Sequence, residues 1–341
     1  MTSTAPLAGI RVVELAGIGP GPHACMLLGD LGAEVTRVER PVEAEVIPGV
    51  TSESDVLLRG RTVVRADLKV PAERDRVLDL IAGADVLVEG YRPGAAERMG
   101  LGPEDCAARN PGLVYARMTG WGQSGPRAHT AGHDINYIAL TGVLDNIGPA
   151  GGDPIPPLNL VGDFGGGSMF LVVGVLAALH ERTRTGRGGV VDGAIVDGVG
   201  ALAQMQWSMR GQGRWSTGRG NNVLDGSAPF YRTYRCADGA HVAVGCIESR
   251  FFRTMLDGLG IDPGSLPPQW DRPRWPEIAS ALETAFAAAP REHWAELFRD
   301  TDACVTPVLT YDEALGDEHL VARGAFVRTP VDAAAPAPRF A

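Results

Sequence analysis

The sequence predicts an α/β protein built on a parallel sheet. Apolar runs with the composition of buried strands occur at residues 10–15, 34–38, 62–64, 85–88 and 113–118. Stretches with helical periodicity alternate with these runs, as at residues 23–31 and 72–81. The chain has 341 residues, of which 45% are apolar, enough for about two domains of ordinary globular composition. Strands that alternate with helices in this way pack as a parallel sheet covered by helices.

A strand, a helix and a second strand open the chain, and glycines occupy the first turn between them. Gly17, Gly19 and Gly21 lie where a Rossmann fold binds pyrophosphate on its backbone N–H groups. Their GxGxG spacing departs from the dinucleotide fingerprint, and Glu39, at the place of the expected acidic residue, is followed at once by Arg40. We therefore disfavour a nicotinamide site. Two interpretations stay open: a tight turn alone, or a site for another nucleotide-bearing ligand with Arg40 as its phosphate partner.

The second half of the chain changes character after a glycine-rich helix. Residues 165–185 begin with three glycines and continue as an apolar helix of about four turns, which is too short to span a membrane. Glycine-rich and polar residues at 210–227 then interrupt the periodicity. Strands and helices are mixed beyond them, at residues 230–235, 241–246, 250–259, 275–288 and 291–298. We expect a large α/β domain at residues 1–200, a crossover at 201–228 and a small α+β domain at 229–321.

Composition excludes several classes of function. A net charge of -10 disfavours binding to a nucleic-acid backbone. The five cysteines are scattered without CxxC spacing, which is typical of reduced and mostly buried thiols. No run approaches the ~18 apolar residues of a membrane span, and the first residues do not have the pattern of a signal peptide. We expect a cytoplasmic protein without a nucleic-acid or membrane partner, and a site without metal or cofactor.

Several separated motifs resemble those of one protein family. The long ones are LAGIRVVELAGIGPGPHA at residues 7–24, ADLK at 66–69, GHDINY at 132–137 and NLVGDFGGGSM at 159–169. Further matching stretches are EGYRPG at 89–94, YARMTGWGQSGP at 115–126 and VAVGCIES at 242–249. Together they resemble the type III CoA-transferase family, the CaiB/BaiF-like proteins, and within it the racemases of 2-methylacyl-CoA thioesters. The likeness covers nearly the whole chain, so it is far more specific than one glycine motif.

The resemblance implies an architecture that periodicity alone does not supply. It implies the type III CoA-transferase fold, with a Rossmann-like large domain made from both ends of the chain and therefore completed by residues 322–341. It also implies an interlocked homodimer whose active sites lie between subunits. The ligand it implies is an acyl-CoA, whose CoA moiety belongs to the substrate.

Three side chains fit the implied chemistry. Moving a proton on and off the carbon next to a thioester requires a base, an acid on the opposite face and donors for the enolate oxygen. By resemblance, His133 and Asp163 are the acid/base pair, and Glu248 contacts His133, where a carboxylate fixes the imidazole tautomer. Without the resemblance, each residue also has a structural interpretation. His133 would be a structural histidine, Asp163 a helix N-cap and Glu248 a solvated turn residue.

Basic residues in the matching motifs are expected to bind the phosphates of CoA, because guanidinium and ammonium groups pair with phosphate. They are Arg40, Lys69, Arg92 and Arg98, with Ala66, Asp67 and Leu68 supplying backbone near the adenosine. A surface role for Arg92 stays open. The substrate-binding set also includes the neighbours of His133, namely Gly132, Asp134, Ile135, Asn136 and Tyr137.

Two other functions remain as alternatives. In a CoA transferase of the same fold, Asp163 attacks the thioester and forms a mixed anhydride that passes CoA to another carboxylic acid. His133 favours racemisation, because a carboxylate nucleophile needs no second proton carrier. The other alternative is a CoA-binding protein without catalysis. Met205 and Met209, close to Trp207 and Trp215, are either core or an adaptable surface for the acyl chain, and we favour core.

Overall fold

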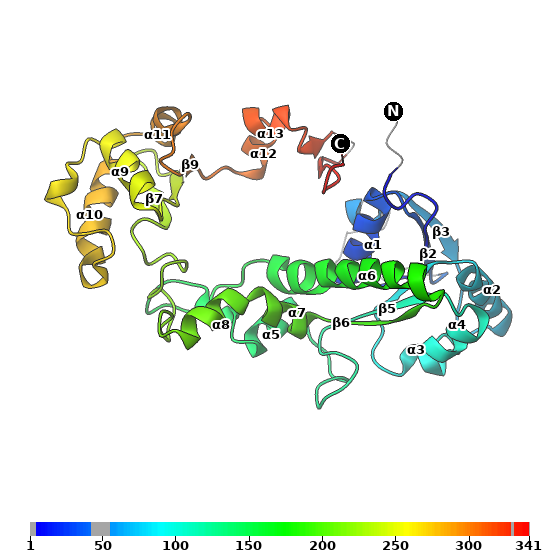
Figure 1. Ribbon diagram of the computed structural model, residues 1–341. Coiled ribbons are helices and arrows are strands. Elements are labelled where there is room, and N and C mark those ends of the chain that lie inside the picture. Colours follow the sequence, from blue (N-terminus) through cyan, green and yellow to red (C-terminus); the bar gives the residue numbers. More distant parts are fainter. Residues whose placement is uncertain (1–4, 42–54, 329–330, 341) are drawn as a thin grey trace. The chain divides into compact units, whose positions relative to one another are not determined.

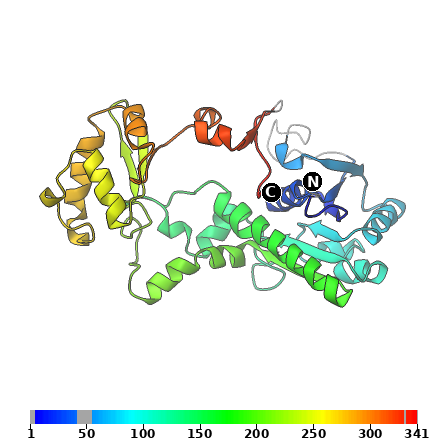
Figure 2. The same ribbon diagram turned by 45° about the horizontal axis from the view of Figure 1, so that its top comes forward.

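The computed structural model describes residues 5–41, 55–328 and 331–340. The chain folds into two compact units. Unit 1 consists of Met1–Val143, Pro156–Met205 and Gly324–Ala341, and unit 2 of Leu144–Ile155 and Gln206–Arg323. Residues 144–155 lie within the sequence range expected for the large domain but belong to unit 2. Figures 1 and 2 trace the elements of each unit along the chain.

Unit 1 is built on a six-stranded parallel sheet, which confirms the predicted α/β class. Its strand order is β3-β2-β1-β4-β5-β6. The strands are β1 (Arg11–Leu15), β2 (Glu34–Glu39), β3 (Arg61–Arg65), β4 (Val86–Glu89), β5 (Val114–Thr119) and β6 (Gly189–Ala194). The sequence did not predict β6, whose GVVDGA stretch carries two glycines and lies at the edge of the sheet.

The strand order places a crevice between two strands. Successive strands move outward from β1 through β2 to β3, and then in the other direction from β4 to β6. In open α/β sheets of this order, ligands bind beyond the carboxyl ends of the strands where the direction reverses. That point lies between β1 and β4, which pair in parallel through Val12 with Val86 and Glu14 with Val88.

Helices cover this sheet. In chain order they are α1 (Pro20–Asp30), a 3-10 turn (Val56–Leu58), α2 (Pro71–Ala82), α3 (Ala95–Arg98), α4 (Pro103–Arg109), α5 (Asp134–Leu140), a π-helix (Leu160–Met169), α6 (Phe170–Thr185) and α7 (Ile195–Leu202). The next helix, α8 (Gln204–Gly211), belongs mostly to unit 2. Two short antiparallel strands of two residues each, β10 (Phe326–Val327) and β11 (Ala333–Ala334), follow. One core cluster packs Leu15, Leu87 and Tyr115 of the strands against Val77 and Ile81 of α2.

The glycine-rich helix is longer than the sequence predicted. It begins at Leu160 as a π-helix and continues as α6 to Thr185, a run of 26 residues with a mean hydropathy of 1.7 over its most apolar window. The α-helical part, α6, has 16 residues and so the predicted length of about four turns. By length and composition the whole run is sufficient to cross a membrane, so the expectation that it is too short to span one was wrong. In unit 1, α6 packs along β5 and β6 through a side that includes the buried Leu171, Val175 and Leu179 (Figures 1 and 2). A buried core helix meets the same criterion of length and hydropathy.

Two glycines allow the π-helix to pack directly on α7. A Cβ at Gly198 would lie 1.8 Å from the carbonyl oxygen of Gly166, and a Cβ at Gly166 would lie 2.6 Å from a methyl of Val199. Both glycines are buried. The close approach of the two helices therefore requires glycine at both positions.

Gly198→Ala is expected to lower the free energy of unfolding by about 1–3 kcal/mol, because the new methyl overlaps backbone that cannot move aside alone. Gly200→Ala is the matched control, since the same helix leaves open space around Gly200. There the substitution is expected to be neutral or stabilising by about 0.5–1 kcal/mol. Denaturant unfolding followed by circular dichroism measures both. Equal stabilities for the two variants would contradict the packing described above.

Unit 2 has the α+β composition that the sequence predicted. Its three strands form an antiparallel sheet in the order β7-β8-β9. The elements are a 3-10 turn (Leu144–Asn146), β7 (Arg232–Arg235), β8 (His241–Val244), α9 (Ser249–Gly258), 3-10 turns at Pro263–Ser265 and Arg272–Arg274, α10 (Trp275–Phe286), α11 (Arg291–Phe298), β9 (Val305–Pro307), α12 (Tyr311–Ala314) and α13 (Glu318–Ala322). Phe230, Tyr234, Phe286 and Trp294 form the centre of its core. The sequence missed β9, which is three residues long and ends on a proline.

Met205 and Trp207 are 57% and 53% exposed in the single chain, so the favoured core position for them was wrong. All five cysteines are free thiols, and four of them are buried, with Cys304 the exposed one.

Candidate active site

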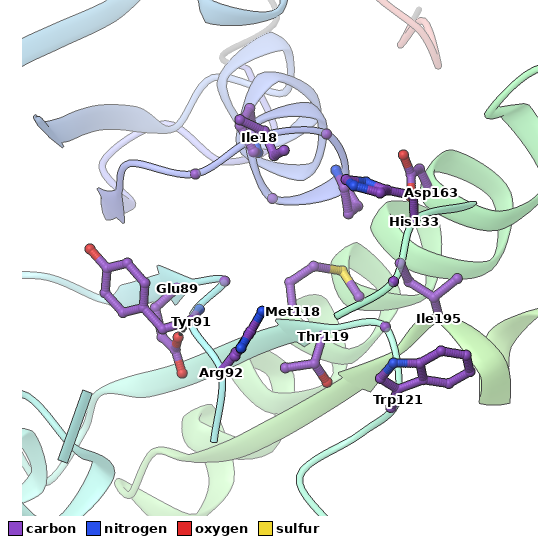
Figure 3. A pocket seen from close by; sticks show the side chains of 18 of the residues that line it. Ile18, Glu89, Tyr91, Arg92, Met118, Thr119, Trp121, His133, Asp163 and Ile195 are labelled. Atoms are coloured by element: carbon purple, nitrogen blue, oxygen red, sulfur yellow. Dashed lines mark hydrogen bonds between the residues drawn. The ribbon is translucent and has the colours of Figure 1, made fainter. Parts of the chain in front are cut away.

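A pocket of about 460 Å³ lies at the carboxyl ends of β1, β4 and β5, in the crevice that the strand order predicts. Its walls come from the glycine turn at residues 14–22, from residues 88–93 and 118–121, and from the segment before and into α5. Asp163 and Ile195 complete the lining. Figure 3 shows side chains from these separate segments gathered around one space.

His133 and Asp163, which are 30 positions apart in the sequence, both line this pocket (Figure 3). His133 is exposed and occupies the N-cap position of α5. Asp163 lies in the first turn of the π-helix, whose N-cap residue is Asn159, so an N-cap role for Asp163 is excluded. The fold therefore brings an imidazole and a carboxylate to the same cavity. Their assignment as the acid/base pair stays a prediction.

The Asp163 carboxylate has a crowded setting. Its Oδ2 accepts a hydrogen bond from Nδ2 of Asn159 at 3.4 Å, and its backbone N–H donates to Oδ2 of Asp134 at 2.7 Å. The glycine turn comes close as well, because a Cβ at Gly19 would lie 3.3 Å from Asp163 Oδ2. Gly19 also has a φ of +66°, a conformation that favours glycine. The turn after β1 therefore makes room for this carboxylate.

The surroundings of Asp163 raise its pKa above the usual range of an aspartate. Burial is the largest cause, and the charge of Asp134 adds to it. The hydrogen bond from Asn159 and the electrostatic influence of His133 oppose the rise. A carboxyl with a raised pKa is better suited to exchange protons with a substrate than an ordinary aspartate is.

The neighbours of His133 hold the segment in place. Asn136 accepts a hydrogen bond from the backbone N–H of His133 at 3.0 Å. The Tyr137 hydroxyl donates to the carbonyl of Gly132, and the Tyr137 ring meets the Trp121 ring edge-on with centroids 4.7 Å apart. Burial raises the pKa of Tyr137, and the charge of Asp163 raises it further. These contacts are intramolecular, and binding of substrate by the same residues stays a prediction.

The basic residues predicted to bind the CoA phosphates are not gathered in this pocket, although Gly132 and Tyr137 of the predicted substrate-binding set line it. Only Arg92 of the four basic residues lines it, and its side chain is labelled in Figure 3. Arg40 follows β2, Lys69 follows β3 and Arg98 ends α3, and all four basic residues are exposed. Within the ADLK segment, Ala66 is buried, Leu68 is half-buried, and Asp67 accepts a hydrogen bond from the backbone N–H of Lys69 at 3.0 Å. Ile135, predicted to contact substrate, is exposed.

A buried charged cluster supports the glycine turn, and sequence reasoning missed it. Glu14, near the end of β1, is 1% exposed and pairs with Arg37 and with Arg61, the latter at 3.1 Å. Both guanidinium groups also reach the turn. Arg61 donates to the carbonyl of Pro22 at 2.6 Å, and Arg37 donates to that of Gly17 at 3.3 Å. A glutamate inside the apolar RVVEL strand was the available signal, because a buried charge requires partners.

A second buried carboxylate supports the loop that carries Arg92. Glu89, the last residue of β4, accepts hydrogen bonds from Arg117 Nε at 2.9 Å and from the backbone N–H of Tyr91 at 2.6 Å. Arg117 also pairs with Glu97 at 2.9 Å. Burial raises the pKa of Glu89, while the bonds from Tyr91 and Arg117 oppose that rise. Glu14 and Glu89 therefore anchor the two loops on either side of the crevice.

Glu248 belongs to unit 2, and its predicted contact with His133 stays a prediction. It is exposed and holds the N-cap position of α9. The two residues before it are held by Gln269, whose Nε2 donates to the carbonyls of Cys246 at 3.1 Å and Ile247 at 2.9 Å. Within residues 5–41, 55–328 and 331–340, no group of three or more His, Cys, Asp or Glu side chains is arranged to hold a metal ion.

Comparisons with known proteins agree over nearly the full chain. The model of CoA-transferase family III matches residues 7–341. An alpha-methylacyl-CoA racemase of Mus musculus is 47% identical over 321 residues, covering 94% of this chain and 82% of that protein. One from Homo sapiens is 43% identical over 332 residues, covering 97% and 85%. A crystal structure of a CaiB/BaiF family protein from Brucella suis superposes with a TM-score of 0.83 at 27% identity, covering 99% of this chain and 93% of that one.

Proposed function

Because the chain belongs to CoA-transferase family III, we propose that it is an alpha-methylacyl-CoA racemase, an isomerase that inverts the α-carbon of 2-methylacyl-CoA thioesters. Two relatives that carry this name are 47% and 43% identical to it over most of both chains. One observation in the structure supports the proposal most strongly: His133 and Asp163 line the same pocket. Racemisation needs a proton carrier on each face of the α-carbon, and this pair supplies two.

In the proposed reaction, one of the two residues removes the α-proton and the other returns a proton to the opposite face. The intermediate is an enolate, whose oxygen requires hydrogen-bond donors. The first N–H groups of α5 follow His133 directly, and the first N–H groups of a helix have no partner inside it. Burial of Asp163 favours its neutral form, so this carboxyl is suited to hold the proton that it later returns.

The remaining parts of the proposal concern the environment of this chemistry. Arg40, Lys69, Arg92 and Arg98 bind the CoA phosphates, and Glu248 orients His133. The protein acts as an interlocked homodimer in the cytoplasm, and it uses no cofactor beyond the CoA moiety of its substrate. The alternative within the family is transfer of CoA between carboxylic acids with Asp163 as nucleophile. The presence of His133 in the pocket favours racemisation.

Hydrogen exchange in D₂O tests the proposal. The protein is expected to incorporate deuterium at the α-carbon of a 2-methylacyl-CoA and to interconvert its two epimers, with no acceptor acid present. Mass spectrometry measures the label, and a chiral separation measures the epimers. A linear acyl-CoA mixed with a free carboxylic acid serves as the transferase control. Absence of exchange together with transfer of CoA to the acid would replace racemase by transferase.

A further inference from the structure

Asp134 joins the two segments that carry the proposed acid/base pair. It follows His133 directly and is the first residue of α5. Its carboxylate Oδ2 accepts the backbone N–H of Asp163 at 2.7 Å, across 29 positions of sequence. One side chain thereby links the start of α5 to the first turn of the π-helix.

The fit around this carboxylate is close. Asp134 is 7% exposed, and its second oxygen, Oδ1, is buried without a hydrogen-bond partner among the described residues. A Cβ at Gly162 would lie 2.4 Å from Asp134 Oδ2, so only glycine lets the carboxylate reach this position. A buried carboxylate with one unpaired oxygen is costly to the fold, which indicates a use for it at this place.

We propose that Asp134 is a positioning residue for the reaction, which holds Asp163 at its distance from His133 and keeps a negative charge beside the Asp163 carboxyl. The proposal rests on the proposed function, because it assumes that Asp163 exchanges a proton with substrate. The hydrogen bond to Asp163 N–H fixes where the first turn of the π-helix lies. The charge makes ionisation of Asp163 less favourable, since two like charges repel each other at short range.

The other ionisable groups on the elements around the π-helix do not raise the pKa of Asp163 as Asp134 does. His133 favours the ionised form of Asp163, opposite in sign to Asp134. Burial and the charge of Asp163 raise the pKa of Tyr137 of α5, and the charge of Arg92 lowers it. His23 of α1 contacts the π-helix through its Nδ1, 2.6 Å from Ser168 Oγ, and burial lowers its pKa. In α7, Asp197 is exposed. Asp134 is thus the acidic neighbour that raises the pKa of Asp163.

Two substitutions separate position from charge. Asp134→Asn keeps an oxygen that can accept the Asp163 N–H and removes the charge, whereas Asp134→Ala removes both. Asp134→Ala is expected to lower kcat about 10²-fold with little change in KM, as misplacement of a reacting group does. Asp134→Asn is expected to recover most of that loss at its own optimal pH. In the pH profile of kcat/KM, the limb that reports ionisation of Asp163 should lie at lower pH in Asp134→Asn than in wild type.

Two further measurements make the result decisive. Asp79→Asn, at an exposed position of α2 that pairs with Arg109, removes the same charge elsewhere and is expected to leave the profile unchanged. The second is a ¹³C NMR titration of carboxyl-labelled aspartate, with the Asp163 signal assigned by its loss in Asp163→Asn, which needs no activity. A lower Asp163 pKa in Asp134→Asn supports the proposal, and an unchanged one overturns it. Full kcat in Asp134→Ala would also overturn it. A wild type without exchange in D₂O would instead sink the proposed function, and the titration would still decide whether Asp134 controls Asp163.

Discussion

His133→Ala is expected to lower kcat for racemisation by about two to four orders of magnitude, the usual contribution of a general base. Racemisation needs a proton carrier on each face of the α-carbon, and this variant keeps only the carrier Asp163. For one epimer, the proton that faces Asp163 can still be removed and replaced by solvent deuterium. We therefore expect slow exchange without inversion for that epimer and no exchange for the other.

Epimer-resolved exchange in D₂O gives the measurement, with each pure epimer as the starting material. His180→Ala is the matched control, because His180 lies exposed on α6 and does not line the pocket. The same variant separates the two family chemistries, since CoA transfer through an Asp163 anhydride does not use His133 as a second proton carrier. A His133→Ala protein that racemises at the wild-type rate would refute the role assigned to this residue.

Asp163→Asn is expected to lower the rate of inversion by about two to four orders of magnitude, as His133→Ala does. The folded protein is expected to become more stable at neutral pH. The stability gain follows from the raised pKa of the half-buried Asp163 carboxyl. In wild type, the carboxyl loses its proton more easily unfolded than folded, so stability falls as pH rises through the interval between the two pKa values. Asparagine does not ionise and escapes this loss. The gain should vanish in acid, below the pKa of about 3.9 of an unfolded aspartate.

Thermal unfolding at several pH values, beside racemisation assays at one pH, tests this pair of effects. The exposed Asp79→Asn is the control for the loss of one carboxylate. If Asp163→Asn loses activity and its melting temperature exceeds that of wild type by an amount that depends on pH, Asp163 is a site residue that lowers the stability of the fold. A variant that is less stable at neutral pH would show that the Asp163 carboxylate supports the fold instead. Because a transferase would also need Asp163, this variant reports the importance of the carboxylate, and His133→Ala reports the chemistry.

Local patterns predicted most of the regular structure, and they failed where packing decides. The strands β1 to β5 and the helices α1 and α2 follow from apolar runs and from periodicity near the observed bounds. The edge strand β6 escaped because two glycines and an aspartate interrupt its short GVVDGA stretch, so no continuous apolar run marks it. The π-helix escaped because its glycines lower helix propensity, whereas its stability comes from direct packing on α7.

By itself, the sequence determined the α/β class, the family and the residue types suited to proton transfer, because motifs and periodicity are local properties that can be counted along the chain. Only the tertiary structure decided that His133 and Asp163 share a pocket and that Asp134 binds the backbone of Asp163. It also decided that Glu14 and Glu89 are buried at the strand ends. These features depend on contacts between distant segments and on exclusion of water, which raises the pKa of a carboxyl such as Asp163. No local pattern of residues carries that information.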